Sequence, residues 1–546
     1  TGAAILFSGT VNATSSGVDT LSASSGIGNI TFTQAIGSLT PLGSLSATGA
    51  TIAQESSATT TGPLSYTGST AVDLSGNITT SSGTVNLTGA VALETDVSID
   101  TTHAAASAGA TITVVNAVNG NKNWSLTSGV GSISLESAVG GVTPLASLTT
   151  SSTGGTASFS NLTIAGPIVV SGYVVTFHQD VTTTNSGSVT ITNTSLLTIA
   201  DGANMTLGGS FLQQGVGGTV STGGNMGLND LMPAAAVGSS GSGITFTDPV
   251  TLTQGITLDT SITNGNISFV STLDGTYDLT LNTGDGDISF GGLVGYTTPL
   301  ATIEVENCDD WTCSAGVKAT ALLQDAGIGT SSFQAIATSS DIDLIGSAFT
   351  FNAAVTTGSF VHIENSDLLT IEPAASFNSA GAFTQIGTGD VDLGGNITTT
   401  GSSDISFHSP IELIGTVSLD TSSGPGNIEF DNTINGLYGL TINAGSGSVT
   451  FDAAVGSTAS LNDLSVTGAT MNITGNQSVA FGPMTYTGAI VLGNDNLALI
   501  DGGFSGPLSV NGTITGNYTF RLISALSSVS VTGDIDLAGS SGSSGT

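Results

Sequence analysis

Aspartates grouped on glycine-rich turns are the side chains of this sequence best suited to bind an ion. Asp285 and Asp287 stand in the segment TGDGD, and Asp309 and Asp310 are adjacent to each other. Carboxylates on turns with flexible glycine neighbours supply the oxygen ligands that Ca²⁺ takes in proteins. Neither an EF-hand loop nor a GGxGxDx repeat is present. The sequence therefore predicts these four aspartates as candidate Ca²⁺ ligands and predicts no other cofactor.

The two cysteines of the chain, Cys308 and Cys313, enclose one of these aspartate pairs. A zinc site would need two more Cys or His ligands, and none is near in the sequence. We therefore predict a disulfide between Cys308 and Cys313 that closes a small protruding loop. Trp311 lies inside this loop, where it could contact a glycan or a neighbouring fibre. Packing of Trp311 against the body of the protein is the expected alternative.

Paired carboxylates raise the question of glycoside hydrolysis. Glu304 with Glu306, and Asp341 with Asp343, are two residues apart. In a strand this spacing places both carboxylates on one face, as a glycosidase pair requires. However, Arg or Lys to bind an acidic sugar is absent nearby, and aromatic residues make up only 5% of the chain.

The histidines add no catalytic motif, because they are tens of residues apart and share no surrounding pattern. We expect them to be exposed residues of strands or turns. They are His103, His178, His362 and His408. No catalytic residue is predicted, and the chain is not expected to be an enzyme.

A recurring segment organises the chain that carries these residues. Gly28–Gly49 reads GNITFTQAIGSLTPLGSLSATG, and closely similar segments begin at Gly131, Gly286 and Gly447. Each copy contains a Gly-led turn, a strand of alternating apolar and small polar residues, a Val/Ile-Gly break and a second strand. A repeat of this kind is stronger evidence for the fold than any single motif is.

The repeats divide the chain into modules of unequal length. The two long modules also match in their first halves, VTFHQDVTTTNSGSVTITNTSLLTI against FTFNAAVTTGSFVHIENSDLLTI. The modules are a C-terminal half-module at 1–50, a short module at 51–153, long modules at 154–307 and 308–469, and an N-terminal half-module at 470–546.

Alternation with a period of two predicts short strands throughout. It is clear in Ile30-Thr31-Phe32-Thr33 and in Val85-Asn86-Leu87-Thr88, whereas no segment has a helical period. The predicted fold is all-β, an elongated parallel β-solenoid built from irregular repeats. A tandem array of β-sandwiches is the alternative. Immunoglobulin-type sandwiches would show recurring Trp or Cys core markers, which the repeated segments lack, and unequal module lengths suit the addition of whole coils.

Charge excludes two classes of partner. The chain has 39 acidic and 3 basic residues among 546, a net charge of −36. Nucleic-acid binding and binding to anionic lipid both need basic surfaces, so neither is expected. No uninterrupted apolar run of about 20 residues could insert into a bilayer.

The repeat style resembles a known group of proteins. The units GNITF…AIG…TPLGSL…TG and GSVTF…AVG…LNDLSVTG resemble the β-strand repeats of very large bacterial surface proteins, the filamentous haemagglutinin-type and autotransporter-type adhesins. The resemblance covers most of the chain. It implies an extracellular right-handed β-helix that acts as a stalk, fibre or adhesin, and it brings no catalytic residue with it.

These observations combine into a functional expectation. We expect an extracellular structural protein, a β-solenoid subunit of a surface fibre whose terminal coils stack head to tail on further copies of itself. The repeat region of a larger adhesin is the alternative, because a half-module at each end would also arise in a section of a longer repeat protein. Glycans or other cell-surface components are the other candidate partners. A polysaccharide-active β-helix enzyme is the least favoured class.

Overall fold

The structure, a computed structural model, consists of strands, turns and bends in all the residues that it describes. These are residues 1–546 without 1, 104–107, 216, 229–242, 503–505 and 538–546. Every strand pairing given for it is parallel, and each strand pairs with the strand one coil later (for example Ile30↔Ile52 and Val361↔Phe383). The predicted parallel β-solenoid is thus confirmed, and the sandwich array is excluded. The described residues contain no helix with the length and apolarity needed to cross a membrane.

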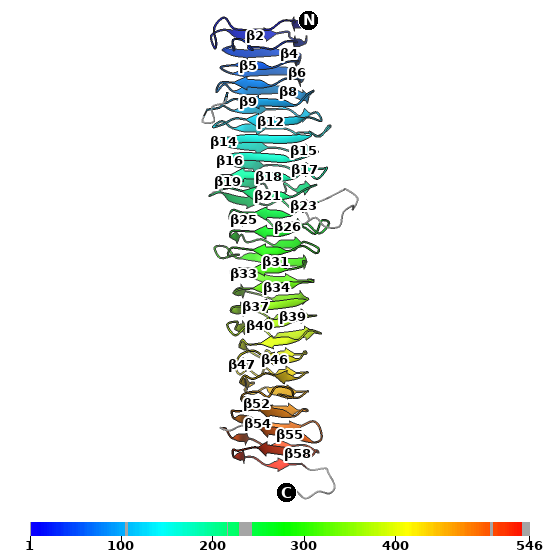
Figure 1. The fold of residues 1–546 in the computed structure, drawn as a ribbon, viewed down its shortest axis with the longest axis vertical. Coiled ribbons are helices and arrows are strands. Elements are labelled where there is room, and N and C mark those ends of the chain that lie inside the picture. Colours follow the sequence, from blue (N-terminus) through cyan, green and yellow to red (C-terminus); the bar gives the residue numbers. More distant parts are fainter. Residues whose placement is uncertain (1, 104–107, 216, 229–242, 503–505, 538–546) are drawn as a thin grey trace. The chain divides into compact units, whose positions relative to one another are not determined.

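The chain forms two compact units, Thr1–Gly286 and Asp287–Thr546, and each is described by itself. In the first unit the strands stack in three columns, which we call faces A, B and C, and Figure 1 shows successive labelled strands of this unit lying one after another. Face A contains β2 (Thr20–Ser24), the first halves of β4 (Ser44–Gln54), β6 (Leu64–Leu74) and β8 (Val85–Leu93), β10 (Ile112–Val114), β13 (Ile133–Leu135), the second halves of β14 (Ser147–Phe159) and β16 (Ile168–Phe177), β19 (Leu196–Ile199), β22 (Thr219–Thr222), β25 (Val250–Leu252) and β28 (Leu273–Asp274).

The other two faces of the first unit are built in the same way. Face B contains β1 (Ile5–Phe7), β3 (Ile30–Phe32), the second halves of β4, β6 and β8, β11 (Val118–Asn119), β15 (Leu162–Ile164), β17 (Val181–Thr183), β20 (Met205–Leu207), β23 (Met226–Leu228), β26 (Ile256–Asp259) and β29 (Leu279–Asn282). Face C contains β5 (Ala58–Thr60), β7 (Ile78–Thr80), β9 (Val97–Asp100), β12 (Asn123–Thr127), the first halves of β14 and β16, β18 (Val189–Asn193), β21 (Phe211–Gln214), β24 (Ile244–Phe246) and β27 (Ile267–Phe269).

The second unit also has three columns, faces D, E and F. Face D contains β30 (Ile288–Phe290), β32 (Trp311–Cys313), β34 (Thr330–Phe333), β37 (Ala348–Phe351), β40 (Leu369–Ile371), β43 (Val391–Leu393), β46 (Ile411–Leu413), β49 (Ile434–Asn435), β53 (Gln477–Val479), β55 (Leu497–Asp501) and β58 (Phe520–Ser524). Face E contains the first half of β33 (Val317–Gln324), β35 (Ile336–Thr338), β38 (Val355–Thr357), β41 (Phe377–Ser379), β44 (Ile397–Thr399), β47 (Val417–Asp420), β50 (Leu440–Asn443), the first halves of β52 (Leu464–Ile473) and β54 (Met484–Leu492), β56 (Leu508–Asn511) and β59 (Val529–Val531).

Face F completes the second unit. It contains β31 (Leu300–Asn307), the second half of β33, β36 (Ile342–Gly346), β39 (Val361–Asn365), β42 (Phe383–Gly387), β45 (Ile405–Phe407), β48 (Ile428–Phe430), β51 (Ser448–Phe451), the second halves of β52 and β54, β57 (Ile514–Thr515) and β60 (Ile535–Asp536).

The core follows directly from the two-residue period. In β3, Ile30 and Phe32 are fully buried while Thr31 between them is half-buried at the surface. Because parallel strands stack in register, each inward side chain lies against its equivalent one coil later. On face F this gives a column of stacked rings, with ring centroids of Phe407 and Phe430 6.0 Å apart and those of Phe430 and Phe451 5.4 Å apart.

The Val/Ile-Gly break of the recurring segment has a steric cause. The glycines at this position, Gly37, Gly140, Gly295 and Gly456, have φ of 66°, 76°, 68° and 69°. A Cβ on any of them would come within 1.9 to 2.4 Å of a backbone oxygen of the next coil. Only glycine therefore fits where the chain turns this closely against its neighbour.

The loop after this glycine is held by an asparagine one coil earlier. The side-chain oxygens of Asn12, Asn119 and Asn435 accept hydrogen bonds from the backbone N–H groups of Leu39 (2.9 Å), Val142 (2.9 Å) and Thr458 (3.0 Å). Because these loop N–H groups have no strand partner, the amide oxygen replaces the ladder at this point. The recurring segment is thus one half of a motif that includes a residue of the preceding coil.

Successive copies of the recurring segment lie on different faces. The first copy begins with β3 on face B, and the second begins with β13 on face A. In the second unit one copy begins with β30 on face D and the next with β51 on face F. The same sequence is therefore accommodated by neighbouring faces, which explains how modules of unequal length can follow one another.

Candidate cation site

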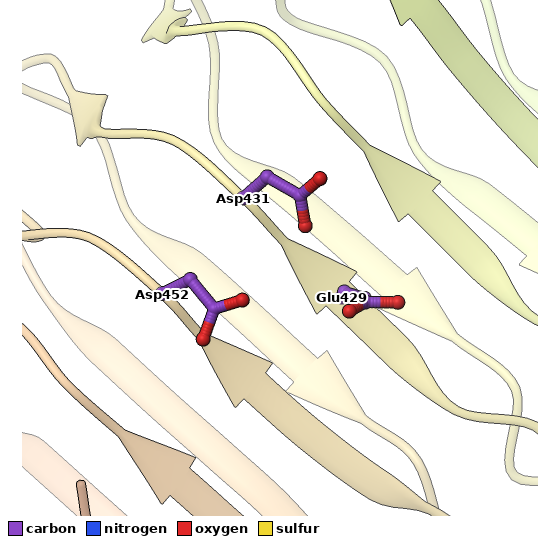
Figure 2. Close-up of side chains that lie close together, drawn as sticks. All are labelled: Glu429, Asp431 and Asp452. Carbon is purple, nitrogen blue, oxygen red and sulfur yellow. The ribbon is translucent and has the colours of Figure 1, made fainter.

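Three carboxylates of the second unit come together where strands of face F end. Glu429 points outward from β48, Asp431 follows that strand directly, and Asp452 follows β51. One ligand oxygen from each lies within 4.8 Å of those of the other two, and all three residues are exposed (Figure 2). Among the residues that the structure describes, no other group of three His, Cys, Asp or Glu side chains converges in this way.

The coil stacking accounts for this arrangement. The backbone N–H of Asp431 donates to the oxygen of Phe407 (3.0 Å), and that of Asp452 donates to the oxygen of Phe430 (2.9 Å). In each coil, one residue directly follows the stacked phenylalanine. These ladder bonds stack that residue on the equivalent residue of the coil before. His408 occupies the same position in the coil before, and its Nδ1 is hydrogen-bonded to Oδ2 of Asp431.

Convergent exposed carboxylate oxygens suit a hard cation such as Ca²⁺, which takes six to eight oxygen ligands and accepts water among them. His408 competes for the same carboxylate, because a protonated imidazole pairs with Asp431 as a cation would. Within the described residues, the geometry therefore offers three carboxylate ligands to a cation.

The predicted Ca²⁺ ligands lie elsewhere and are not part of this group. Asp285 belongs to the first unit, where its Oδ2 accepts a hydrogen bond from Nδ2 of Asn264 (3.1 Å). In the second unit, Oδ1 of Asp287 accepts from the backbone N–H of Asp310 (3.4 Å), and Oδ1 of Asp310 accepts from that of Thr330 (2.8 Å). Asp309 is half-buried beside Asp310. Asp287 and Asp310 thus cap the strand of the next coil, the role that asparagines have elsewhere in the chain.

The predicted disulfide is absent from the structure. Cys308 and Cys313 are free thiols and both are buried. The protruding loop is also absent, because Trp311–Cys313 form the strand β32 with Trp311 and Cys313 pointing inward. Trp311 is fully buried, and its ring packs edge-on between those of Phe290 (6.2 Å) and Phe333 (5.0 Å). Trp311 thus packs against the protein, as the expected alternative had it, but it lies inside the core and not on the outer wall.

Burial makes both thiols weaker acids than an exposed cysteine is. It raises the pKa of Cys308 to about 12, with a further contribution from Asp309, Asp310 and Asp287. It also raises the pKa of Cys313 well above its ordinary value. Since the thiolate is the nucleophile and the metal ligand, neither sulfur is set up for catalysis or for binding zinc.

A second acidic group lies in register on face D. Asp392 of β43 and Glu412 of β46 are direct neighbours in adjacent coils. Burial raises the pKa of Asp392, and Asp390 and Glu372 raise it further. Burial and the charge of Asp392 likewise raise the pKa of Glu412. Like charges in register are destabilising, so this pair is a local electrostatic strain in the ladder.

The histidines and paired carboxylates considered from the sequence lie at separate places on the described surface. His362 pairs with Asp343 of the coil before (Nδ1–Oδ1 2.7 Å), and Nε2 of His178 lies 3.1 Å from Oγ of Ser158. Glu304 and Glu306 both lie on the outer side of β31.

Sequence reasoning missed the group of Glu429, Asp431 and Asp452. A signal for it exists, because His or Asp directly follows a phenylalanine in three segments that are 21 to 23 residues apart, Phe407-His408, Phe430-Asp431 and Phe451-Asp452. Recognising it would have required knowing that these three phenylalanines stack on one another.

Comparison with protein-family models, with curated proteins and with solved structures finds no match to this chain.

Proposed function

We propose that this protein is an extracellular structural protein, a β-solenoid subunit that extends a surface fibre by stacking coil upon coil. The observation that carries the proposal is the parallel ladder that continues from coil to coil within each unit. Inward positions are buried coil after coil, for example Val355, Phe377 and Ile397 on face E at 0–1% exposure. A protein built in this way is stabilised by nearest-neighbour contacts between coils, which suits a rod or fibre.

The last described coil of the second unit supports assembly with a further coil. Val529 is 44% exposed and Ile535 is 50% exposed, whereas their register partners one coil earlier, Leu508 and Ile514, are fully buried. Among the described residues these apolar side chains face solvent, and an exposed parallel strand edge is a template for another strand. A coil of a second copy of this chain would cover these side chains and continue the ladder.

Replacement of Ile535 by Lys tests this edge, because a charged side chain on a strand edge blocks pairing. In sedimentation velocity over a concentration series, the unchanged protein is expected to form species that grow with concentration, while Ile535→Lys stays smaller. Val169→Lys, at an exposed position of β16 in the first unit, is the matched control and should behave like the unchanged protein. Equal sedimentation of all three proteins at every concentration would contradict assembly through this edge.

The second candidate function is the stalk of a large adhesin, supported by the resemblance of the repeats in the sequence. Immunogold labelling of intact and permeabilised cells of the source organism distinguishes a surface protein from an internal one. Labelling only after permeabilisation would contradict both functions.

A further inference from the structure

Three polar atoms in the core of the first unit have no hydrogen-bond partner among the described residues. They are Nε1 of Trp124, Oγ1 of Thr150 and Oγ of Ser152. The three side chains point inward from face C, and they belong to two successive coils, β12 and the first half of β14. Each of these residues is at most 1% exposed. A buried polar group without a partner costs free energy, so three of them on adjacent strands call for an explanation.

The coil that contains Thr150 has two undersized side chains in its core layer. In the register column of face C, Thr150 lies between Leu126 of the coil before and Val170 of the coil after. On face A of the same coil, Ala157 lies in register between an isoleucine and a valine. All of these positions are buried. Since protein cores are closely packed, two shortened side chains in one layer provide space for a small guest beside the three polar atoms.

The three atoms define the chemistry of this guest. The indole nitrogen of Trp124 only donates a hydrogen bond, whereas the hydroxyls of Thr150 and Ser152 can both donate and accept. None of the three groups is charged, so they offer no counter-ion to a buried cation or anion. A guest that accepts from the indole and exchanges hydrogen bonds with the hydroxyls meets all three requirements. Water does so, and a buried water typically makes about three hydrogen bonds.

We infer that the first unit binds a water molecule in its core between Trp124, Thr150 and Ser152. This water joins two successive coils of face C through hydrogen bonds that are additional to the backbone ladder. Polar groups that lie beyond direct hydrogen-bond distance of one another are bridged by water in this way. The site goes beyond the proposed structural function and does not depend on it.

Replacement of Thr150 by Val tests the inference, because it removes one partner of the water and nearly keeps the shape of the side chain. Thr150→Val should lower the protection of the β14 amides against hydrogen exchange about tenfold, since the water and its remaining partners lose a buried hydrogen bond. The exchange is measured on the full chain.

The matched control is Thr222→Val. Thr222 is fully buried and its Oγ1 also has no partner among the described residues. However, neither β22 nor the described strands in register with it carry a second atom of this kind. Here the substitution only removes an unsatisfied hydroxyl, so the protection of the β22 amides should stay equal or rise.

A high-resolution crystal structure of the unchanged chain is the second measurement, and it does not depend on the folding of a variant. We expect density for a water within hydrogen-bond distance of at least two of the three atoms. A core in which the ring of Trp124 packs directly on Thr150, with no density between them, would overturn the inference. Protection of β14 that is unchanged or raised by Thr150→Val would overturn it too, because the hydroxyl would then have no buried partner to lose.

Discussion

The two cysteines show how strongly the chemistry of a residue depends on the face to which it points. Cys313 alternates with an exposed Thr312 in β32 and so faces the core. From the sequence, two cysteines around DDWT look like the ends of a loop. The alternating pattern that would have predicted a strand here is only three residues long, Trp311–Cys313.

Thiol labelling distinguishes the free, buried cysteines from a disulfide. In native protein at pH 8, we expect Ellman's reagent to react with neither Cys308 nor Cys313, because burial shields both and raises both pKa values. In denaturant without reductant, both thiols should react. Denatured protein that reacts only after reduction would show that the disulfide exists after all.

The carboxylates of Asp392 and Glu412 should make the protein less stable at neutral pH. Their pKa values are raised from 3.8 and 4.5, so the folded state holds these protons to a higher pH than the unfolded chain does. The stability that they contribute is therefore fully present below their ordinary pKa values and is lost as the pH rises through the folded-state values.

Asp392→Asn should accordingly stabilise the second unit at pH 7 by about 0.2–1 kcal/mol, the cost of like charges in register. At pH 3 it should have little effect, because both carboxyls are then protonated. Hydrogen exchange of β43 and β46 at the two pH values measures this, with Glu55→Gln, an exposed carboxylate of the first unit, as the control. Equal stabilisation at both pH values would contradict the electrostatic explanation.

At the scale of elements, the two-residue period allowed the short parallel strands to be predicted, because most of the described strands follow it. The strand on which each strand stacks could not be predicted from the sequence, since copies of the recurring segment lie on different faces. Asp431 and Asp452 illustrate the consequence. They are neighbours through the ladder, yet they are 21 positions apart in a sequence whose coils differ in length.

Stacked phenylalanines should hold the coils of face F together. Phe430 is 1% exposed and packs between Phe407 and Phe451. Phe430→Ala should destabilise the second unit by about 3–5 kcal/mol, because the coils on either side cannot close the cavity. Denaturant unfolding measures this loss, and hydrogen exchange should place it in β45, β48 and β51.

The matched control is Phe360→Ala, since Phe360 is 38% exposed and lies in a corner before β39. Phe360→Ala should lower the free energy of unfolding much less than Phe430→Ala does. Similar losses for the two variants would mean that the ring column is not what stabilises these coils.

At the scale of the whole molecule, 39 acidic residues against 3 basic ones give the chain a net charge of one sign, −36. Such a charge disfavours side-by-side association of copies, because like charges repel. In the last described coil, Val529 and Ile535 expose apolar side chains instead. The proposed growth by stacking would bury these apolar side chains.

Electron microscopy of the purified chain at increasing concentration tests the proposed stacking most directly. The proposal predicts unbranched filaments that lengthen with concentration and whose averaged diffraction shows a layer line at about 4.8 Å, the spacing of stacked strands. Isolated particles of one size at every concentration would contradict it.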